Sequence, residues 1–192
     1  IPKWLSYLGR SHSFDDVRKA VNLAKAKGLS NINVDMMYGF EGQTIEELNK
    51  DIDEFLSLDV PHISAYSLSV EEGTILQNKK AIQDDDLAGE MYKVILSRLR
   101  DAGYSRYEVS NFAKDGYQCR HNLTYWKDEE YDAFGLGASG YKDGVRYTYT
   151  KNLLVYLHNR ELAYSETVTS EDDIQYYLTT NLRLAEGFSL SS

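Results

Sequence analysis

The stretch from residue 31 to residue 44 most constrains the fold of this chain. Ile32, Val34 and Met36 are apolar at every second position, which is typical of a strand with one buried face. A loop with two glycines follows, and Thr44 begins a segment with the pattern of an N-terminally capped helix. A strand that runs into a glycine-containing loop and then a helix predicts a ligand-binding βα unit.

Asp35 is the one charged residue in this predicted strand. An unpaired buried carboxylate costs several kcal/mol, so two interpretations remain open. In the first, a neighbouring basic residue pairs with Asp35 in the core. In the second, the carboxylate reaches the C-terminal end of the strand and binds a ligand hydroxyl or ammonium, as functional groups do in parallel α/β folds.

The first 70 residues predict alternating helices and strands. A helix begins after Ser13 and ends at Gly28, and the strand with Asp35 follows. Next come the helix that Thr44 opens and a second strand over residues 62–68. Helices of this length connect parallel strands, so the order predicts part of an α/β barrel or of a doubly wound sheet. Two parallel strands cannot cover their own faces, which indicates a fragment of such a fold.

From about residue 71 the pattern changes to that of a mixed α+β domain. Asp143 and Gly144 predict the tight turn of a hairpin between residues 140–142 and 145–147. The other elements expected here are a long helix over 84–103, a short aromatic strand over 107–112, a polar loop through Cys119, and helices over 152–161 and 170–184, the last capped by Ser170 with Asp173.

Composition excludes several functional classes. The formal net charge of -9, without a polybasic cluster, argues against a nucleic-acid partner. No apolar run approaches the roughly 20 residues of a membrane span, and no leader segment is recognisable, so a cytoplasmic protein is expected. Cys119 is the only cysteine, which excludes an internal disulfide and any multi-cysteine metal site.

Seven short motifs occur in one order along nearly the whole chain. They are LGRSHS at 8–13, NVDMMYG at 33–39, GQT at 42–44, EGT at 72–74, YEVSNFA at 107–113, CRHNLTYW at 119–126 and GLGA at 135–138. In these motifs the chain resembles the radical-SAM family of oxygen-independent coproporphyrinogen III oxidases and their haem-chaperone relatives.

The resemblance implies the C-terminal part of a partial (β/α)6 radical-SAM barrel, over residues 1–75, followed by a smaller α+β C-terminal domain over 76–192 that is incomplete at its end. The family binds S-adenosylmethionine (SAM) and holds a [4Fe-4S] cluster through a three-cysteine loop, which this sequence lacks. SAM and the cluster are therefore expected as cofactors of the full-length protein. This chain should retain neither tightly and should be inactive alone as a radical-SAM oxidoreductase.

The family's SAM contacts match four positions of this chain. Arg10 and Asp35 match in residue type, whereas Ser69 and Tyr141 occupy family positions whose residues differ in type. Alternatives from the residues alone are a surface role for Arg10 and hairpin packing for Tyr141. No residue of this chain is assigned as catalytic or as a ligand of the cluster.

His121 is a haem-ligand candidate, because it lies beside Cys119, Tyr125 and Trp126 and because imidazole ligates haem iron. The alternative is that it hydrogen-bonds backbone at a domain junction. The order Arg-His-Asn-Leu-x-Tyr-Trp resembles the haem-chaperone branch, whereas the oxidase branch tends to have His-Arg-Asn-Phe-x-Gly-Tyr.

The resemblance favours a haem-chaperone-like protein that binds haem and transfers it to an acceptor protein. Peripheral contact with a membrane-bound acceptor is part of this expectation. The alternative is the radical-SAM oxidative decarboxylation of coproporphyrinogen III, in which a 5′-deoxyadenosyl radical abstracts hydrogen from a propionate side chain. A third interpretation is a lid or interaction module. The expected ligand is accordingly haem or a porphyrinogen.

Overall fold

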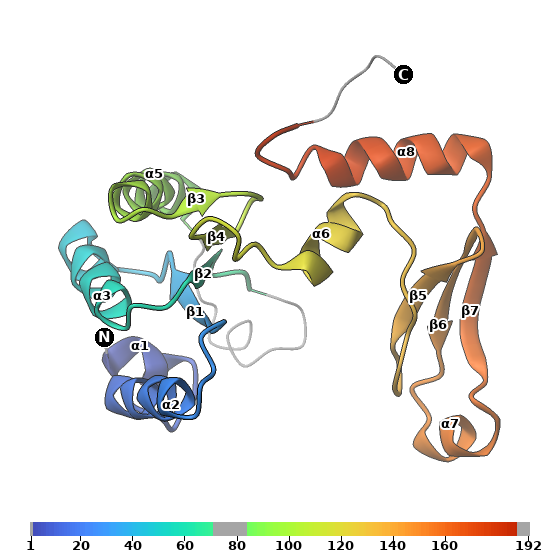
Figure 1. The fold of residues 1–192 in the computed structure, drawn as a ribbon, viewed down its shortest axis with the longest axis horizontal. Coiled ribbons are helices and arrows are strands. Elements are labelled where there is room, and N and C mark those ends of the chain that lie inside the picture. The colour runs from blue at the N-terminus through green and yellow to red at the C-terminus, as the bar shows by residue number, and fades with distance from the viewer. Residues whose placement is uncertain (1, 71–83, 188–192) are drawn as a thin grey trace. The chain divides into compact units, whose positions relative to one another are not determined.

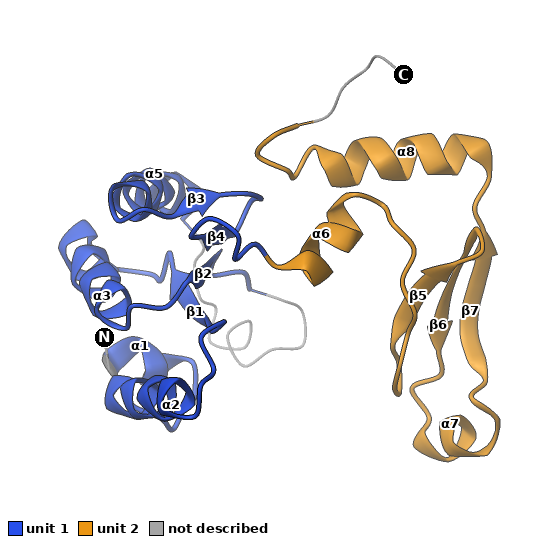
Figure 2. Ribbon diagram, in the orientation of Figure 1, with its two compact units in different colours: residues 1–118 blue, residues 119–192 orange. Residues whose placement is uncertain are grey.

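The computed structural model describes residues 2–70 and 84–187. The chain divides into two compact units, residues 1–118 (unit 1) and residues 119–192 (unit 2), which Figure 2 shows in blue and orange. The predicted end of the barrel units at residue 75 is a different kind of boundary from the division between these two compact units. It stays a prediction. The EGT motif at 72–74 lies outside the described residues.

Unit 1 contains a four-stranded sheet with helices on it (Figure 1). The strand order is β1-β2-β4-β3, with β1 and β2 parallel and β4 antiparallel to both of its neighbours. The elements are α1 (Pro2–Tyr7), α2 (Phe14–Ala26), β1 (Asn33–Tyr38), α3 (Ile45–Ser57), β2 (His62–Ser67), α5 (Asp85–Asp101), β3 (Ser105–Arg106) and β4 (Asn111–Ala113). The predicted parallel βα arrangement is confirmed.

Local hydrogen bonds fix where the helices of unit 1 begin. Ser13 and Asp16 form a capping box before α2, and Thr44 forms one with Glu47 before α3. The side chain of Asp84 accepts a hydrogen bond at the start of α5. These three helix starts agree with the sequence-based expectations.

One face of the sheet packs in the core. Val34 and Met36 of β1 and Ile63 of β2 are buried there with residues of α3 and α5. Side chains alternate along a strand, so the neighbouring residues of β1 and β2 lie on the opposite face. We call this the polar face; it consists of Asn33, Asp35, Met37, His62, Ser64 and Tyr66.

The expected single strand over 107–112 is wrong. The chain instead forms the short strands β3 and β4, and a turn over residues 107–110 joins them. Glu108 is buried, and its Oε1 accepts a hydrogen bond from the Ser110 N–H at 3.0 Å. Tyr92 of α5 donates to the Val109 carbonyl, so a distant helix also holds this turn. Such tertiary contacts cannot be read from local periodicity.

Unit 2 contains a three-stranded antiparallel sheet in the order β5-β6-β7 and three helices. The elements are α6 (Arg120–Trp126), β5 (Ser139–Lys142), β6 (Val145–Tyr149), α7 (Leu153–Asn159), β7 (Leu162–Thr167) and α8 (Ser170–Asn181). Asp143 and Gly144 both have positive φ, 51° and 71°, as the primed turn of a tight hairpin requires. The predicted hairpin is confirmed.

Three expectations for unit 2 are wrong. Residues 120–126 form the helix α6 and not a polar loop. Strand β7 was not expected, because nearly all its residues are exposed and it forms through pairing with β6. Helix α8 is capped by Thr169 with Asp172, one residue before the predicted Ser170 pair.

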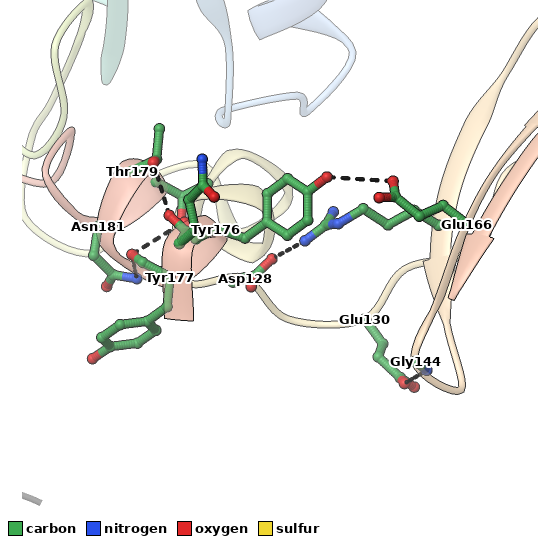
Figure 3. A network of polar contacts seen from close by, with 11 residues as sticks. Asp128, Glu130, Gly144, Glu166, Tyr176, Tyr177, Thr179 and Asn181 are labelled. Atoms are coloured by element: carbon green, nitrogen blue, oxygen red, sulfur yellow. Dashed lines mark hydrogen bonds and ion pairs between the residues drawn. The ribbon is translucent and has the colours of Figure 1, made fainter. Parts of the chain in front are cut away.

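Arg146 of β6 connects the sheet of unit 2 to its helices. Its guanidinium carbon lies 4.2 Å from the ring centroid of Tyr141 and 4.0 Å from that of Tyr176, and its Nη2 pairs with Asp128. Figure 3 shows the polar contacts around Asp128 and Tyr176, in which Tyr176 donates to Glu166. None of the helices in ranges 2–70 and 84–187 is long and apolar enough to cross a membrane.

We expect Gly140→Ala to destabilise unit 2. A Cβ at Gly140 would lie 2.5 Å from Cζ of Tyr147, the cross-strand partner whose hydroxyl accepts from the Ala133 N–H. The ring would have to move, so the free energy of unfolding should fall by about 1–3 kcal/mol in urea denaturation. Gly89→Ala is the control: its Cβ meets nothing within 4 Å in α5, and it should stabilise by about 0.5–1 kcal/mol. Equal effects of both substitutions would contradict the argument.

Candidate functional site

A cavity of about 380 Å³ lies in unit 1. It is lined by α1, by the segment between α1 and α2, by β1, by residues on α3, and by Tyr66 of β2. Both Arg10 and Asp35 are among its lining residues. The structure therefore brings together two of the four predicted SAM contacts.

The end of α1 positions Arg10. Gly9 has a φ of 69°, a left-handed conformation that favours glycine. The Gly9 N–H donates to the Ser6 carbonyl at 3.0 Å, and the Arg10 N–H donates to the Leu5 carbonyl at 2.8 Å. These two bonds form a Schellman motif, which ends the helix and fixes the backbone of the residue after the glycine. Arg10 is thus placed by backbone geometry.

Asp35 is exposed on the polar face, so the interpretation as a buried core aspartate is wrong. It is the third of six residues in β1, which also differs from the expected place at the end of the strand. Asn33 Nδ2 donates to Asp35 Oδ1 at 2.8 Å. Asp35 lies on the opposite face of β1 from Val34 and Met36, and all three residues line the cavity.

Arg10 and Asp35 line one cavity without forming an ion pair with each other, and neither side chain forms an ion pair with any other part of the chain that the structure describes. A guanidinium donates up to five hydrogen bonds and a carboxylate only accepts them. The cavity therefore offers separate partners to an anionic and to a cationic or hydroxyl-bearing part of a ligand.

Apolar and aromatic side chains form much of the remaining wall. The rings of Trp4 and Phe40 are stacked with centroids 4.7 Å apart, and Phe14 and Phe55 meet edge to face at 5.6 Å. Asp51 of α3 also lines the cavity, and burial raises the pKa of its carboxyl group. An apolar wall with a few polar groups is the usual composition of a small-molecule site.

Tyr66 is 41% exposed and lines the cavity. Its register partner in β1 is Met37, two residues from Asp35 on the same face. The strand periodicity contained this signal, because in parallel pairing Tyr66 must share the face of Asp35 once Ile63 and Ala65 are buried.

Ser69 and Tyr141 do not line this cavity. Ser69 is exposed in the segment after β2. Tyr141 belongs to unit 2, where it is 8% exposed and packs against Arg146, and burial raises the pKa of its hydroxyl group. The assignment of these two residues as SAM contacts, which comes from the family resemblance, therefore stays a prediction.

His121 lies in the first turn of α6 and is exposed. Its Nε2 lies 2.7 Å from the Tyr125 hydroxyl, and the two rings meet edge to face at 4.7 Å. Cys119 is the N-cap residue of the same helix and is partly buried. The four-residue spacing of His121 and Tyr125 places them on one helix face, which explains their contact.

The residues of this chain do not fit a [4Fe-4S] cluster. Such clusters are held by several thiolates, and the sequence has one cysteine. In the ranges 2–70 and 84–187, moreover, no group of three or more histidine, cysteine, aspartate and glutamate side chains is placed to hold a metal ion. The chain can supply a ligand pocket but not the cluster.

His62 is buried on the polar face, next to Asp35. Its Nδ1 lies 2.6 Å from Asn33 Oδ1 and its Nε2 lies 2.8 Å from the Tyr107 hydroxyl. Burial lowers the pKa of the imidazole below its usual 6.5, while the nearby Asp35 carboxylate raises it to a lesser extent.

Comparison with known proteins places these features in a family. The chain is 38% identical over 173 residues to the haem chaperone HemW of Lactococcus lactis, a match that covers 88% of this chain and 45% of that protein. It is 36% identical over 195 residues to HemW of Bacillus subtilis, covering 96% and 52%. The mitochondrial radical S-adenosyl methionine domain-containing protein 1 of mouse is 38% identical over 141 residues, covering 71% and 32%. No model of a known protein family matches the chain.

A solved structure supports the fold. Coproporphyrinogen III oxidase (HemN) of Escherichia coli, a radical-SAM enzyme, superimposes with a TM-score of 0.78 at 15% identity, covering 93% of this chain and 46% of that one. This match confirms the expected fold class. The chain belongs to the radical-SAM family of haem chaperones and oxygen-independent coproporphyrinogen III oxidases, and it spans about half the length of the curated relatives it matches.

The buried His62 predicts a pH dependence of stability. Its folded pKa is below the unfolded value of 6.5, so the unfolded state binds the proton more readily. Stability should be complete above pH 6.5 and should fall as the pH decreases toward the folded pKa, by at most about 1.4 kcal/mol per pH unit. Urea denaturation between pH 7.5 and 5 should show a steeper loss for the wild type than for His62→Asn. Parallel profiles for the two proteins would contradict this linkage.

Proposed function

We propose that this chain forms part of a longer, haem-chaperone-like radical-SAM protein, and that the cavity of unit 1 is part of its SAM pocket. The observation that carries the proposal is that Arg10 and Asp35 line one cavity without pairing with each other. Support comes from the family, whose SAM-contacting arginine and aspartate match these two positions.

The chemistry of SAM suits this cavity. SAM carries a carboxylate, an ammonium group and ribose hydroxyls, together with an adenine ring. Arg10 can donate to the carboxylate, and Asp35 can accept from the ammonium or from hydroxyls. The aromatic wall around Trp4 and Phe40 suits the uncharged part of the ligand. When bound, SAM together with the cluster supplies the radical chemistry of the family; this chain's residues bind and orient SAM.

For the whole protein, the proposed function is to bind haem and pass it to an acceptor protein in the cytoplasm. The relatives that carry the name haem chaperone support this reading, as does the Arg-His-Asn-Leu-x-Tyr-Trp order around His121. His121 is the proposed haem ligand. Ser69 and Tyr141 remain proposed SAM contacts, and an acceptor at a membrane surface remains part of the proposal.

The second candidate is oxidative decarboxylation of coproporphyrinogen III, which the structural likeness to an oxidase of that class favours. An assay of the full-length protein for protoporphyrinogen formation, beside a haem titration, separates the two. Haem binding without product formation would support the chaperone, whereas product formation would support the oxidase. Absence of both would leave an interaction module.

The first test concerns SAM. In the full-length protein, Asp35→Ala should weaken SAM about ten- to a hundredfold, because a hydrogen bond to a charged group contributes roughly 1.5–3 kcal/mol. The measurement is the Kd for SAM by equilibrium dialysis. Asp132→Ala is the control, since Asp132 is an exposed aspartate paired with Lys142 in unit 2. Unchanged SAM affinity of Asp35→Ala would overturn the pocket assignment.

The second test concerns haem. In the full-length protein, His121→Ala should shift or abolish the Soret band of bound haem, because the axial imidazole is lost. Cys119→Ser should leave the band largely intact, and His158→Ala is a control in α7. If the three variants retain the wild-type spectrum, His121 is a structural residue of α6 and haem is bound elsewhere.

A further inference from the structure

A chain of hydrogen bonds on the polar face ends at Asp35. It runs from the Tyr107 hydroxyl to His62, from His62 to Asn33, and from Asn33 to Asp35 Oδ1, with heavy-atom distances of 2.8, 2.6 and 2.8 Å. Ser64 also donates to Asn33 Oδ1, at 3.1 Å. We propose that Asn33 and His62 are positioning residues that hold the Asp35 carboxylate in its ligand-binding orientation. This proposal rests on the assignment of Asp35 to the SAM pocket.

The direction of each hydrogen bond follows from the chemistry of the groups. An ionised carboxylate only accepts, so the Asn33 atom beside Asp35 must be the amide nitrogen. The Asn33 atom that faces His62 is then the carbonyl oxygen, which also only accepts. His62 must therefore carry its proton on Nδ1, and in the neutral ring Nε2 is left as the acceptor for the Tyr107 hydroxyl.

The members of this hydrogen-bond chain come from two strands and one turn. Asn33 pairs with His62 in the parallel register of β1 and β2, and Asp35 pairs with Ser64. His62 and Ser64 are 4% and 2% exposed, and β4 lies beside them with Asn111 opposite Ser64. Tyr107 comes from the turn between β3 and β4. The turn between β3 and β4 thus supplies the hydroxyl that donates to Nε2 of the Nδ1-protonated His62.

The orientation of Asp35 matters because the structure gives its carboxylate no cationic partner among the described residues. Asn33 is the one side chain shown to hydrogen-bond it. If Asn33 rotates or is lost, the exposed carboxylate gains rotamer freedom that a ligand must remove on binding. The groups behind Asn33 should therefore affect ligand affinity without touching the ligand.

Two conservative substitutions of His62 separate positioning from packing. Asparagine places an amide nitrogen at the δ position, where it can still donate to Asn33, whereas glutamine places its polar atoms at the ε position toward Tyr107. In the full-length protein, His62→Asn should keep the Kd for SAM within about twofold of wild type, and His62→Gln should raise it about fivefold. If His62 only fills space, the order should reverse, because glutamine is closer in volume to histidine.

A double-mutant cycle tests whether Asn33 acts through Asp35. Asn33→Ala should raise the Kd for SAM about fivefold in the wild type and by less than twofold in the Asp35→Ala background. Equal effects in both backgrounds would overturn the positioning role. If Asp35→Ala itself leaves SAM binding unchanged, the pocket assignment fails; if only the Asn33 and His62 variants are silent, this inference fails alone.

Tyr107→Phe removes the hydroxyl at which the hydrogen-bond chain begins, and Tyr104→Phe is its matched control. Tyr104 is a buried tyrosine of the same unit whose hydroxyl donates to the Val60 carbonyl, away from His62. In 15N spectra of the labelled full-length protein, the wild type and Tyr104→Phe should show His62 as the Nδ1-protonated tautomer. Tyr107→Phe should shift the Nε2 resonance and raise the Kd for SAM about twofold. An Nε2-protonated His62 in the wild type would contradict the proposal.

Discussion

The register between β1 and β2 is the constraint on which the rest of unit 1 depends. Because side chains alternate along each strand, the pairing of Val34 with Ile63 commits Asp35 and Ser64 to the other face. A slip of one residue would expose the apolar set and bury the carboxylate. The buried core on one face of the sheet and the position of Asp35 on the other face therefore have one physical origin. Stability of the core also selects the orientation of the site.

Arg10 and Asp35 are held in the cavity in different ways. The backbone hydrogen bonds of a Schellman motif place Arg10, while a side-chain hydrogen bond from Asn33 holds Asp35. Neither arrangement needs the other charge, so the two side chains are not drawn into a mutual ion pair. An ion pair between them would have to break before a ligand could bind, at the cost of its attraction. Separate support leaves both charges available to a zwitterionic ligand.

Much of the fold could be predicted from sequence because its signals are local. The Thr44 capping box and the Asp143-Gly144 turn depend on residues within three positions of one another. The wrong predictions concern segments whose structure depends on residues distant in the sequence. Strand β7 is nearly all exposed and exists through pairing with β6, and the turn at residues 107–110 is held by α5 and by a buried glutamate. Local patterns contain no information on such distant partners.

The residues of the candidate site also differ in whether local sequence patterns could predict them. Arg10 and Asp35 followed from the family motifs. The residues alone left open whether Asp35 pairs in the core or binds a ligand, and the structure places it on the exposed face of β1. Tyr66 and His62 were not predicted as neighbours of Asp35, because their proximity depends on the parallel register of β1 and β2. Asn33 lies two residues before Asp35 on the same strand face, so the period-two pattern contained this neighbour. Ser69 and Tyr141 came from the family alone; Ser69 is not among the residues that line the cavity, and Tyr141 belongs to unit 2.

His121 shows how a neighbouring hydroxyl limits metal ligation. A neutral imidazole has one nitrogen with a free electron pair, and iron requires that pair. The Tyr125 hydroxyl lies within hydrogen-bonding distance of Nε2. If the hydroxyl donates, the pair on Nε2 is engaged, and iron must displace Tyr125. If Nε2 carries the proton and donates instead, the pair on Nδ1 is available. The tautomer of His121 therefore decides which nitrogen would be available to haem iron in its proposed role as a ligand.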